Sequence, residues 1–202
     1  MNTKKLLAVL VSVAMCGAAF AGCGNNADSS KAESKAESSS QVEKMPETDE
    51  EWTQAMYDKA MVSYGNTSMM QNVIKKAQSG EKVTVAYLGG SITEGISAGA
   101  DGCYAKLTYD YFAQKFGNVQ YVNAGLSGTP SKLGILRLDR DVLAYEPDIC
   151  FIEFAVNDGT ETDYQNAYES IVRTLLQKNI TPVLLFSVTE NDHSAQDYMK
   201  QI

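Results

Sequence analysis

The sequence predicts an α/β fold of three layers, in which helices cover both faces of a parallel sheet. Short, nearly continuous apolar segments at 83–89, 119–124, 148–154 and 182–188 have the length and composition of buried strands. Amphipathic segments with helical periodicity separate these strands, so the two kinds of element alternate along the chain. Strand–helix alternation with strands that are apolar on both sides requires helices on both faces of the sheet.

A helix is expected after each of the first three strands. The first runs over 103–117, the second opens at Thr129-Pro130 with the proline at its first helical position, and the third precedes the strand at 182–188. The apolar residues that they carry are Leu107, Tyr111 and Phe112, then Leu133, Leu136 and Leu143, then Tyr164, Tyr168, Ile171 and Leu175.

Two further helices are predicted before the first strand. Thr48 and Glu51 form a capping-box pattern that opens a helix through about Ser63. The next helix runs from about Thr67 to Gln78, and Gly80 stops it. Its apolar face could be interpreted as a binding stripe, but helical spacing favours core packing; the residues are Met69, Met70, Val73, Ile74 and Ala77.

The segment 182–188 has no charge and no edge-protecting residue, so it has the character of an interior strand. A flavodoxin-like parallel sheet, with strand order 2-1-3-4-5, needs a fifth strand beside the fourth. We therefore expect four strands here, with the fifth missing from a domain truncated at its C-terminus.

The N-terminus has the pattern of a secretory signal. Lys4 and Lys5 precede an apolar stretch at 6–14 that is too short to span a bilayer, and "AAFAG" leads into Cys23. This resembles the lipobox of bacterial lipoproteins, with Phe20 where leucine is usual, and implies diacylglycerol on Cys23 and an extracytoplasmic, membrane-anchored protein. An ordinary signal peptide cleaved without lipidation is the alternative.

Residues 1–22 are thus expected to be the signal, 23–47 a disordered tether and 48–202 the folded domain. The tether is rich in Ser, Ala, Glu and Lys, and has too little apolar surface to offset its chain entropy. The formal net charge of -8 argues against a nucleic-acid partner. Cys103 and Cys150 form no disulfide framework and no zinc-ligand spacing, so we expect no metal or other cofactor.

The turn after the first strand, "YLGGSITEG" at 87–95, could hold a phosphate or present a nucleophile. A phosphate-binding P-loop needs a lysine where Ile96 stands, and the dinucleotide pattern G-x-G-x-x-G is absent from this turn. Ser91 instead falls just past the C-terminal end of a strand, where parallel sheets gather their ligands. The pattern therefore favours a serine nucleophile.

Two more loops leave the same edge of the sheet, "NAGLSGTPS" at 123–131 and "EFAVNDG" at 153–159. Together with "GGSIT", these loops resemble the conserved blocks of the SGNH, or GDSL-type, hydrolases, although Gly90 stands where many members carry Asp. The resemblance implies that Ser91 attacks an ester, and that the backbone N–H groups of Ser91 and Gly128 and the Asn157 amide stabilise the oxyanion. Asn157 could instead tie a turn, and Gly128 could serve backbone geometry alone.

The family places its general base in an Asp-x-x-His pair after the fifth strand, and nothing in the sequence corresponds to that pair. His193, the only histidine, follows Glu190 at the same spacing but one strand too early, so we expect it to be an ordinary loop residue. The 202-residue chain is therefore expected to be weakly active or inactive as an esterase.

The predicted function is a lipid-anchored esterase that acts on a small-molecule or glycan ester, with an O-acetylated carbohydrate preferred over a lipid. A non-catalytic glycan-binding lipoprotein on the same fold is the main alternative, and a surface interaction module is a further one.

Overall fold

A computed structural model of the chain describes residues 53–187 and 196–202. The predicted signal, Cys23, the tether and His193 lie outside these residues. The chain divides into two units, residues 1–61 and 62–202, and each is described by itself.

The sheet of the second unit has four strands: β1 (Val83–Gly89), β2 (Val119–Gly125), β3 (Ile149–Glu153) and β4 (Thr181–Leu185). Their order is β2-β1-β3-β4, and every pair is parallel. The predicted α/β fold is therefore confirmed. Gly89, the last residue of β1, pairs with Gly125 on one side and Glu153 on the other, so three strands end at one level.

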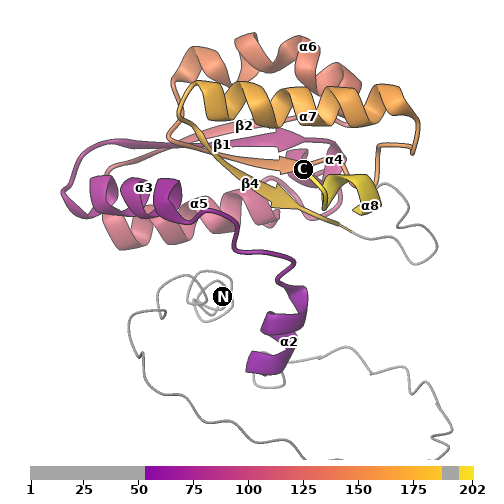
Figure 1. Cartoon of the computed structure of the whole chain (residues 1–202). Coiled ribbons are helices and arrows are strands. Elements are labelled where there is room, and N and C mark those ends of the chain that lie inside the picture. Colours follow the sequence, from indigo (N-terminus) through magenta and orange to yellow (C-terminus); the bar gives the residue numbers. More distant parts are fainter. Residues whose placement is uncertain (1–52, 188–195) are drawn as a thin grey trace, which may run out of the picture. The chain divides into compact units, whose positions relative to one another are not determined.

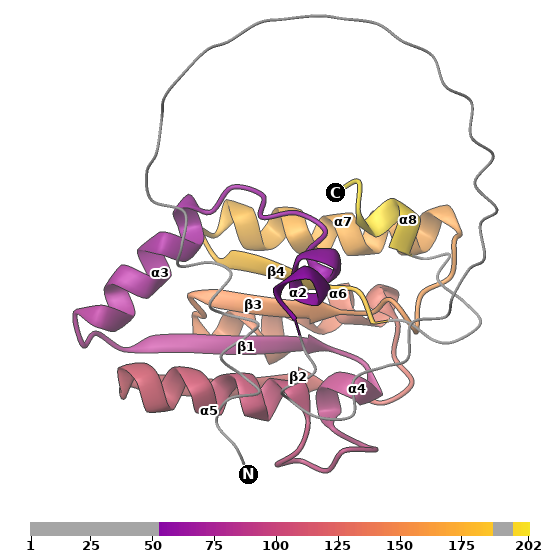
Figure 2. The ribbon, with the colours of Figure 1, turned by 90° about the horizontal axis from the view of Figure 1, so that it is seen from below.

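Helices cover both faces of this sheet (Figures 1 and 2). One face carries α6 (Ser131–Asp141) and α7 (Thr162–Gln177), and the other carries α3 (Ser68–Gln78) and α5 (Tyr104–Phe116). The main apolar cluster lies between the sheet and the α6–α7 layer; it includes Leu88, Cys150, Ile152, Phe154, Tyr168, Ile171 and Leu175. Val73 and Ala77 are buried on α3, which agrees with core packing of its apolar face.

The short helices α4 (Ser91–Glu94) and α8 (Gln196–Met199) lie at the end of the sheet to which the strands point (Figure 1). A 3-10 turn, η2 (Leu143–Tyr145), follows α6. Among the residues that the structure describes, no helix is long and apolar enough to cross a bilayer.

In the first unit, α2 (Gln54–Ala60) occupies part of the helix predicted from Thr48 to Ser63. Thr53 is its N-cap, in extended conformation, and its hydroxyl accepts the Met56 N–H at 3.4 Å. Met61 returns to extended backbone, so the helix ends earlier than predicted. Thr48 and Glu51 lie outside the described residues.

Helix α6 differs from its prediction at both ends. Pro130 is extended and stands at the N-cap, so Ser131 is the first helical residue, and the helix stops at Asp141 before Leu143. Its buried face is formed by Ser131, Gly134, Arg137 and Leu138, whereas Leu136 is 81% exposed. Gly134 is small because a Cβ there would lie 2.6 Å from the ring of Phe154.

Candidate active site

Ser91 begins α4 immediately after the end of β1. Gly90 is the N-cap of this single turn, and Gly95, with a φ of 94°, ends it in the left-handed conformation that favours glycine. The carbonyl of Ser91 accepts the N–H groups of Gly95 and Ile96 at 2.9 and 3.1 Å. Ser91 is partly exposed and lies at the C-terminal edge of the sheet, where parallel sheets gather their ligands.

The two glycines before Ser91 are required by close neighbours. A Cβ on Gly89 would overlap the Thr93 hydroxyl and lie 2.6 Å from the carbonyl oxygen of Glu153. A Cβ on Gly90 would overlap Oδ1 of Asn157 and lie 3.0 Å from its Cγ and 3.4 Å from its Nδ2. The amide of Asn157 therefore rests on the backbone next to Ser91.

Asn157 is placed by the turn that follows β3. Its backbone N–H donates to the carbonyl of Phe154 at 2.9 Å, and its side chain is half-buried. Oδ1 is buried and has no hydrogen-bond partner among the described residues, so it does not tie this turn. An amide oxygen against Gly90 leaves the NH₂ group as the polar end that a ligand could use.

Gly128 lies in the loop after β2. Its φ of 70° is left-handed, it is exposed, and no atom lies within 4 Å of a Cβ placed on it. The start of the same loop packs tightly against α4, because a Cβ on Gly125 would overlap the Glu94 backbone nitrogen and lie 2.6 Å from its Cα. The structure thus brings the loops of Ser91, Gly128 and Asn157 to one end of the sheet.

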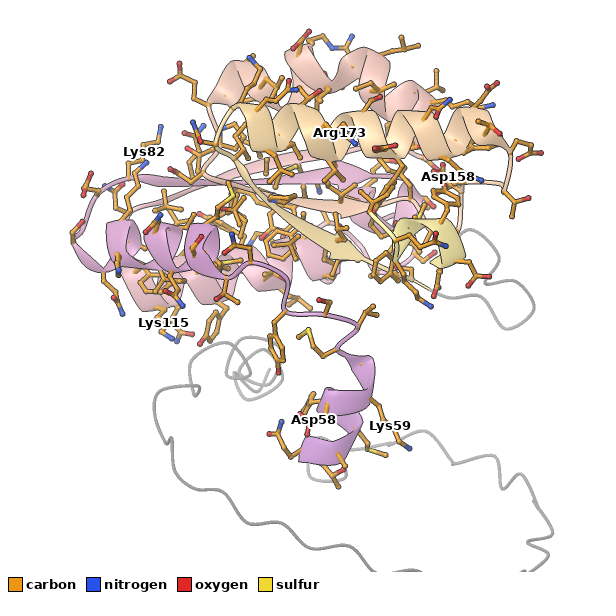
Figure 3. The ribbon with its side chains drawn as sticks, in the orientation of Figure 1. Asp58, Lys59, Lys82, Lys115, Asp158 and Arg173 are labelled. Atoms are coloured by element: carbon orange, nitrogen blue, oxygen red, sulfur yellow. The ribbon has the colours of Figure 1, made fainter. Side chains whose placement is uncertain are left out.

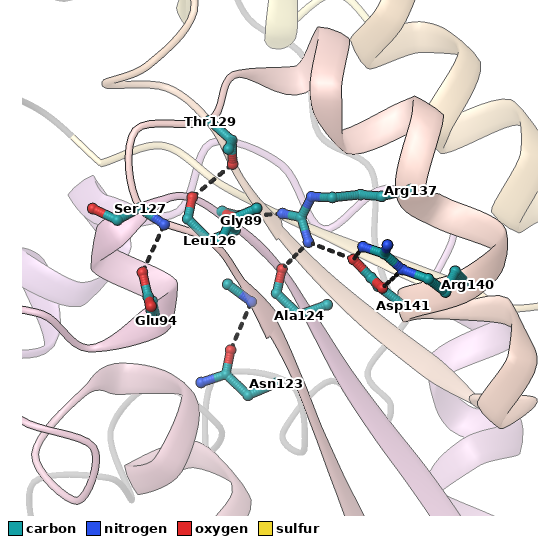
Figure 4. Close-up of polar contacts among 11 residues, drawn as sticks. Gly89, Glu94, Asn123, Ala124, Leu126, Ser127, Thr129, Arg137, Arg140 and Asp141 are labelled. Atoms are coloured by element: carbon teal, nitrogen blue, oxygen red, sulfur yellow. Dashed lines mark hydrogen bonds and ion pairs between the residues drawn. The ribbon is translucent and has the colours of Figure 1, made fainter.

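Several polar side chains join these loops, and the sequence did not reveal them (Figure 4). Glu94 Oε2 accepts the Ser127 N–H at 2.6 Å. Asn123 accepts the Gly125 N–H at 2.8 Å and donates from Nδ2 to the Thr93 carbonyl at 2.9 Å. The nucleophile turn and the loop after β2 are therefore held together by hydrogen bonds of both backbone and side chain.

Arg137 holds the same two strand ends from the other face of the sheet (Figure 4). Its guanidinium donates to the carbonyls of Ala124, at 2.6 Å, and Gly89, at 3.0 Å. Asp141, one turn later on α6, pairs with it at 3.1 Å. Arg137 shares the buried face of α6, and a buried arginine needs polar partners. An arginine on the apolar face of a predicted helix is therefore the sequence signal that could have marked this residue.

Asp158 lies beside Asn157 near α8 (Figure 3). Its carboxylate accepts the Ser131 N–H at 2.7 Å, and so caps α6 in place of the side-chain cap that Pro130 lacks. The Tyr198 hydroxyl donates to its other oxygen at 3.0 Å. Burial raises the pKa of the Asp158 carboxyl, and the hydrogen bonds from Ser131 and Tyr198 oppose that rise.

Within 53–187 and 196–202, no group of three His, Cys, Asp or Glu side chains could hold a metal ion. Cys103 and Cys150 are both buried free thiols. Burial raises the pKa of the Cys150 thiol to about 12, as expected for a core residue and not for a nucleophile.

A groove of about 410 Å³ begins at the loop after β2 and follows the outer edge of that strand. Its lining combines two tyrosines with polar and charged groups; Tyr121, Asn123, Leu126, Arg140, Asp141 and Tyr145 are among them. Tyr145, which follows α6 and precedes β3, is 48% exposed, so an aromatic face is open to solvent at the end of this groove that lies away from the nucleophile turn.

The family model described as GDSL-like Lipase/Acylhydrolase matches residues 87–202. A two-domain esterase active on acetylated mannans, solved with mannopentaose, is similar at 32% identity and a TM-score of 0.68, covering 72% of this chain and 41% of that one. An acetyl xylan esterase is similar at 23% identity and a TM-score of 0.48, covering 57% and 68%. No curated protein matches the sequence. The chain thus spans less than half the length of the two-domain esterase.

Proposed function

Because the chain belongs to the GDSL-like lipase/acylhydrolase family, we propose that the protein is a serine ester hydrolase that removes acetyl groups from carbohydrate. The observation that carries this proposal is the position of the Asn157 amide on Gly90, directly beside Ser91. A hydroxyl and a neutral donor at adjacent strand ends supply two of the groups that acyl transfer requires, the nucleophile and an oxyanion donor.

In the proposed reaction, Ser91 Oγ attacks the acyl carbon and its proton passes to a general base. The carbonyl oxygen becomes an oxyanion, which the N–H groups of Ser91 and Gly128 and the Asn157 amide stabilise. As this intermediate collapses, the ester C–O bond breaks, the protonated base gives its proton to the departing sugar oxygen, and an acyl group remains on Ser91 Oγ. Water then releases acetate by the same steps. All three donors are uncharged N–H groups, so their hydrogen bonds to the carbonyl oxygen strengthen as negative charge develops on it.

Two observations support a glycan ester over a lipid ester. The two-domain esterase that resembles this chain acts on acetylated mannans. The groove that runs from the loop after β2 along that strand to the exposed Tyr145 also carries polar side chains, a mixture that suits an extended polyhydroxyl ligand better than an acyl chain.

The lipid anchor belongs to the same proposal. Support for it comes from Lys4, Lys5, the short apolar stretch and the small residues that lead to Cys23. A protein anchored there would meet polymeric glycans outside the cytoplasm.

The test compares the full-length protein, including any continuation of this chain that carries the general base, with its Ser91→Ala variant. We expect a serine-directed fluorophosphonate to label the wild type and not the variant, and we expect acetate release from acetylated mannan to exceed fatty-acid release from a triglyceride. Loss of the nucleophile should reduce kcat by about 10⁴-fold or more. His193→Ala is the control and should leave labelling unchanged. Binding of mannan without labelling or acetate release would show a binding module instead.

A further inference from the structure

Glu94 connects the nucleophile turn to the loop that carries Gly128. It lies in the same helical turn as Ser91, and its carboxylate accepts the backbone N–H of Ser127, the residue directly before Gly128 (Figure 4). The distance of 2.6 Å is short for an N–H donor, as in hydrogen bonds to a charged acceptor.

The loop is fixed step by step along its length. Leu126 donates its N–H to the Gly89 carbonyl at 3.0 Å, and the Thr129 hydroxyl donates to the Leu126 carbonyl at 2.6 Å. Between these points, Glu94 holds Ser127. Gly128 has open space around it and a left-handed φ, so its own contacts do not set its direction. Its peptide is therefore oriented by its neighbours.

We propose that Glu94 is a positioning residue, which aims the Gly128 N–H at the oxyanion by holding Ser127. This inference rests on the proposed function, because it assigns a purpose to the geometry of that site. Ser127 is exposed, so water can replace the lost acceptor and the cost to stability is small. The cost to the reaction is larger, since a donor displaced by about 1 Å loses much of its effect.

The kinetic test uses two substitutions of Glu94 and one control, all made in the full-length protein that includes any continuation of this chain carrying the general base. Glu94→Ala removes the acceptor and should lower kcat for 4-nitrophenyl acetate by about ten- to a hundredfold, with KM little changed. Glu94→Gln keeps an acceptor oxygen and should restore most of that loss. Asp101→Ala removes an exposed carboxylate from the segment that follows α4, and should match the wild type.

A second readout does not depend on activity. Amide hydrogen exchange at Ser127 should be about tenfold faster in Glu94→Ala than in the wild type, and Glu94→Gln should lie between them. If exchange at Ser127 and kcat are both unchanged in Glu94→Ala, the positioning role is wrong. If the activity of Glu94→Ala falls only in proportion to its loss of folded protein, and Glu94→Gln does not restore that activity, Glu94 has a merely structural role. Absence of hydrolysis by the wild-type full-length protein would overturn the proposed function, and the exchange data would still decide whether Glu94 holds the loop.

Discussion

The side chain of Glu153 is fully buried at the end of β3, where its backbone pairs with Gly89. Neither carboxyl oxygen makes a hydrogen bond of good geometry among the described residues, although the Ser187 hydroxyl and backbone N–H groups lie close to them. Burial raises the pKa of this carboxyl, and it outweighs the Ser187 hydroxyl and nearby backbone N–H groups, which favour the charged form. This buried side chain is thus neutral to a higher pH than an ordinary glutamate.

We expect Glu153→Gln to stabilise the protein increasingly as the pH rises. The folded-state pKa lies above the unfolded value of 4.5, so stability from the neutral side chain is full below 4.5 and falls as pH rises through the folded pKa. Glutamine stays neutral throughout. Thermal melts from about pH 4 to 8 should therefore show a growing difference in Tm in favour of the variant. Glu146→Gln removes an exposed carboxyl and is the control; parallel curves for wild type and Glu153→Gln would contradict the prediction.

At the scale of elements, α6 is attached to the sheet by a polar contact as much as by apolar packing. Arg137 is 8% exposed and reaches through to carbonyls of both β1 and β2. Asp141 balances its charge from the next turn. The helix therefore sets the spacing of the two strand ends from which the Ser91 turn and the Gly128 loop depart.

Arg137→Ala is expected to lower the free energy of unfolding by about 2–3 kcal/mol, because the buried carbonyl of Ala124 loses its charged donor and Asp141 loses a partner. Arg140→Ala is the matched control. Arg140 pairs with the same Asp141 but its side chain is 78% exposed, so its loss should lower the free energy of unfolding much less than the loss of Arg137. Denaturant unfolding followed by circular dichroism measures both, and equal costs would show that the contacts of Arg137 with the strands contribute little.

For the molecule as a whole, the sequence predicted the parallel sheet well because its strands are apolar on both sides; β1 was predicted to the residue, at Val83–Gly89. It also placed Ser91, Gly128 and Asn157 at adjacent strand ends. The contacts of Glu94 with Ser127 and of Arg137 with Gly89 were not predictable, because the partners are 33 and 48 residues apart in the sequence. Local sequence patterns contain no information about contacts at such separations. The sequence did not indicate which face of α6 is buried, because two of its leucines, Leu133 and Leu136, are exposed.

The predicted architecture combines a catalytic head with an anchor at Cys23, and the two should be separable. The formal net charge of -8 opposes attraction to an anionic membrane surface, so attachment would depend on the lipid. Diacylglycerol plus an acylated amine supplies enough chains for stable anchoring, whereas one chain gives only marginal binding. We expect the wild type in the membrane fraction, with lipid on Cys23 by mass spectrometry, and Cys23→Ser outside that fraction with unchanged fluorophosphonate labelling. Equal partitioning of the two proteins would favour the alternative of a signal peptide cleaved without lipidation.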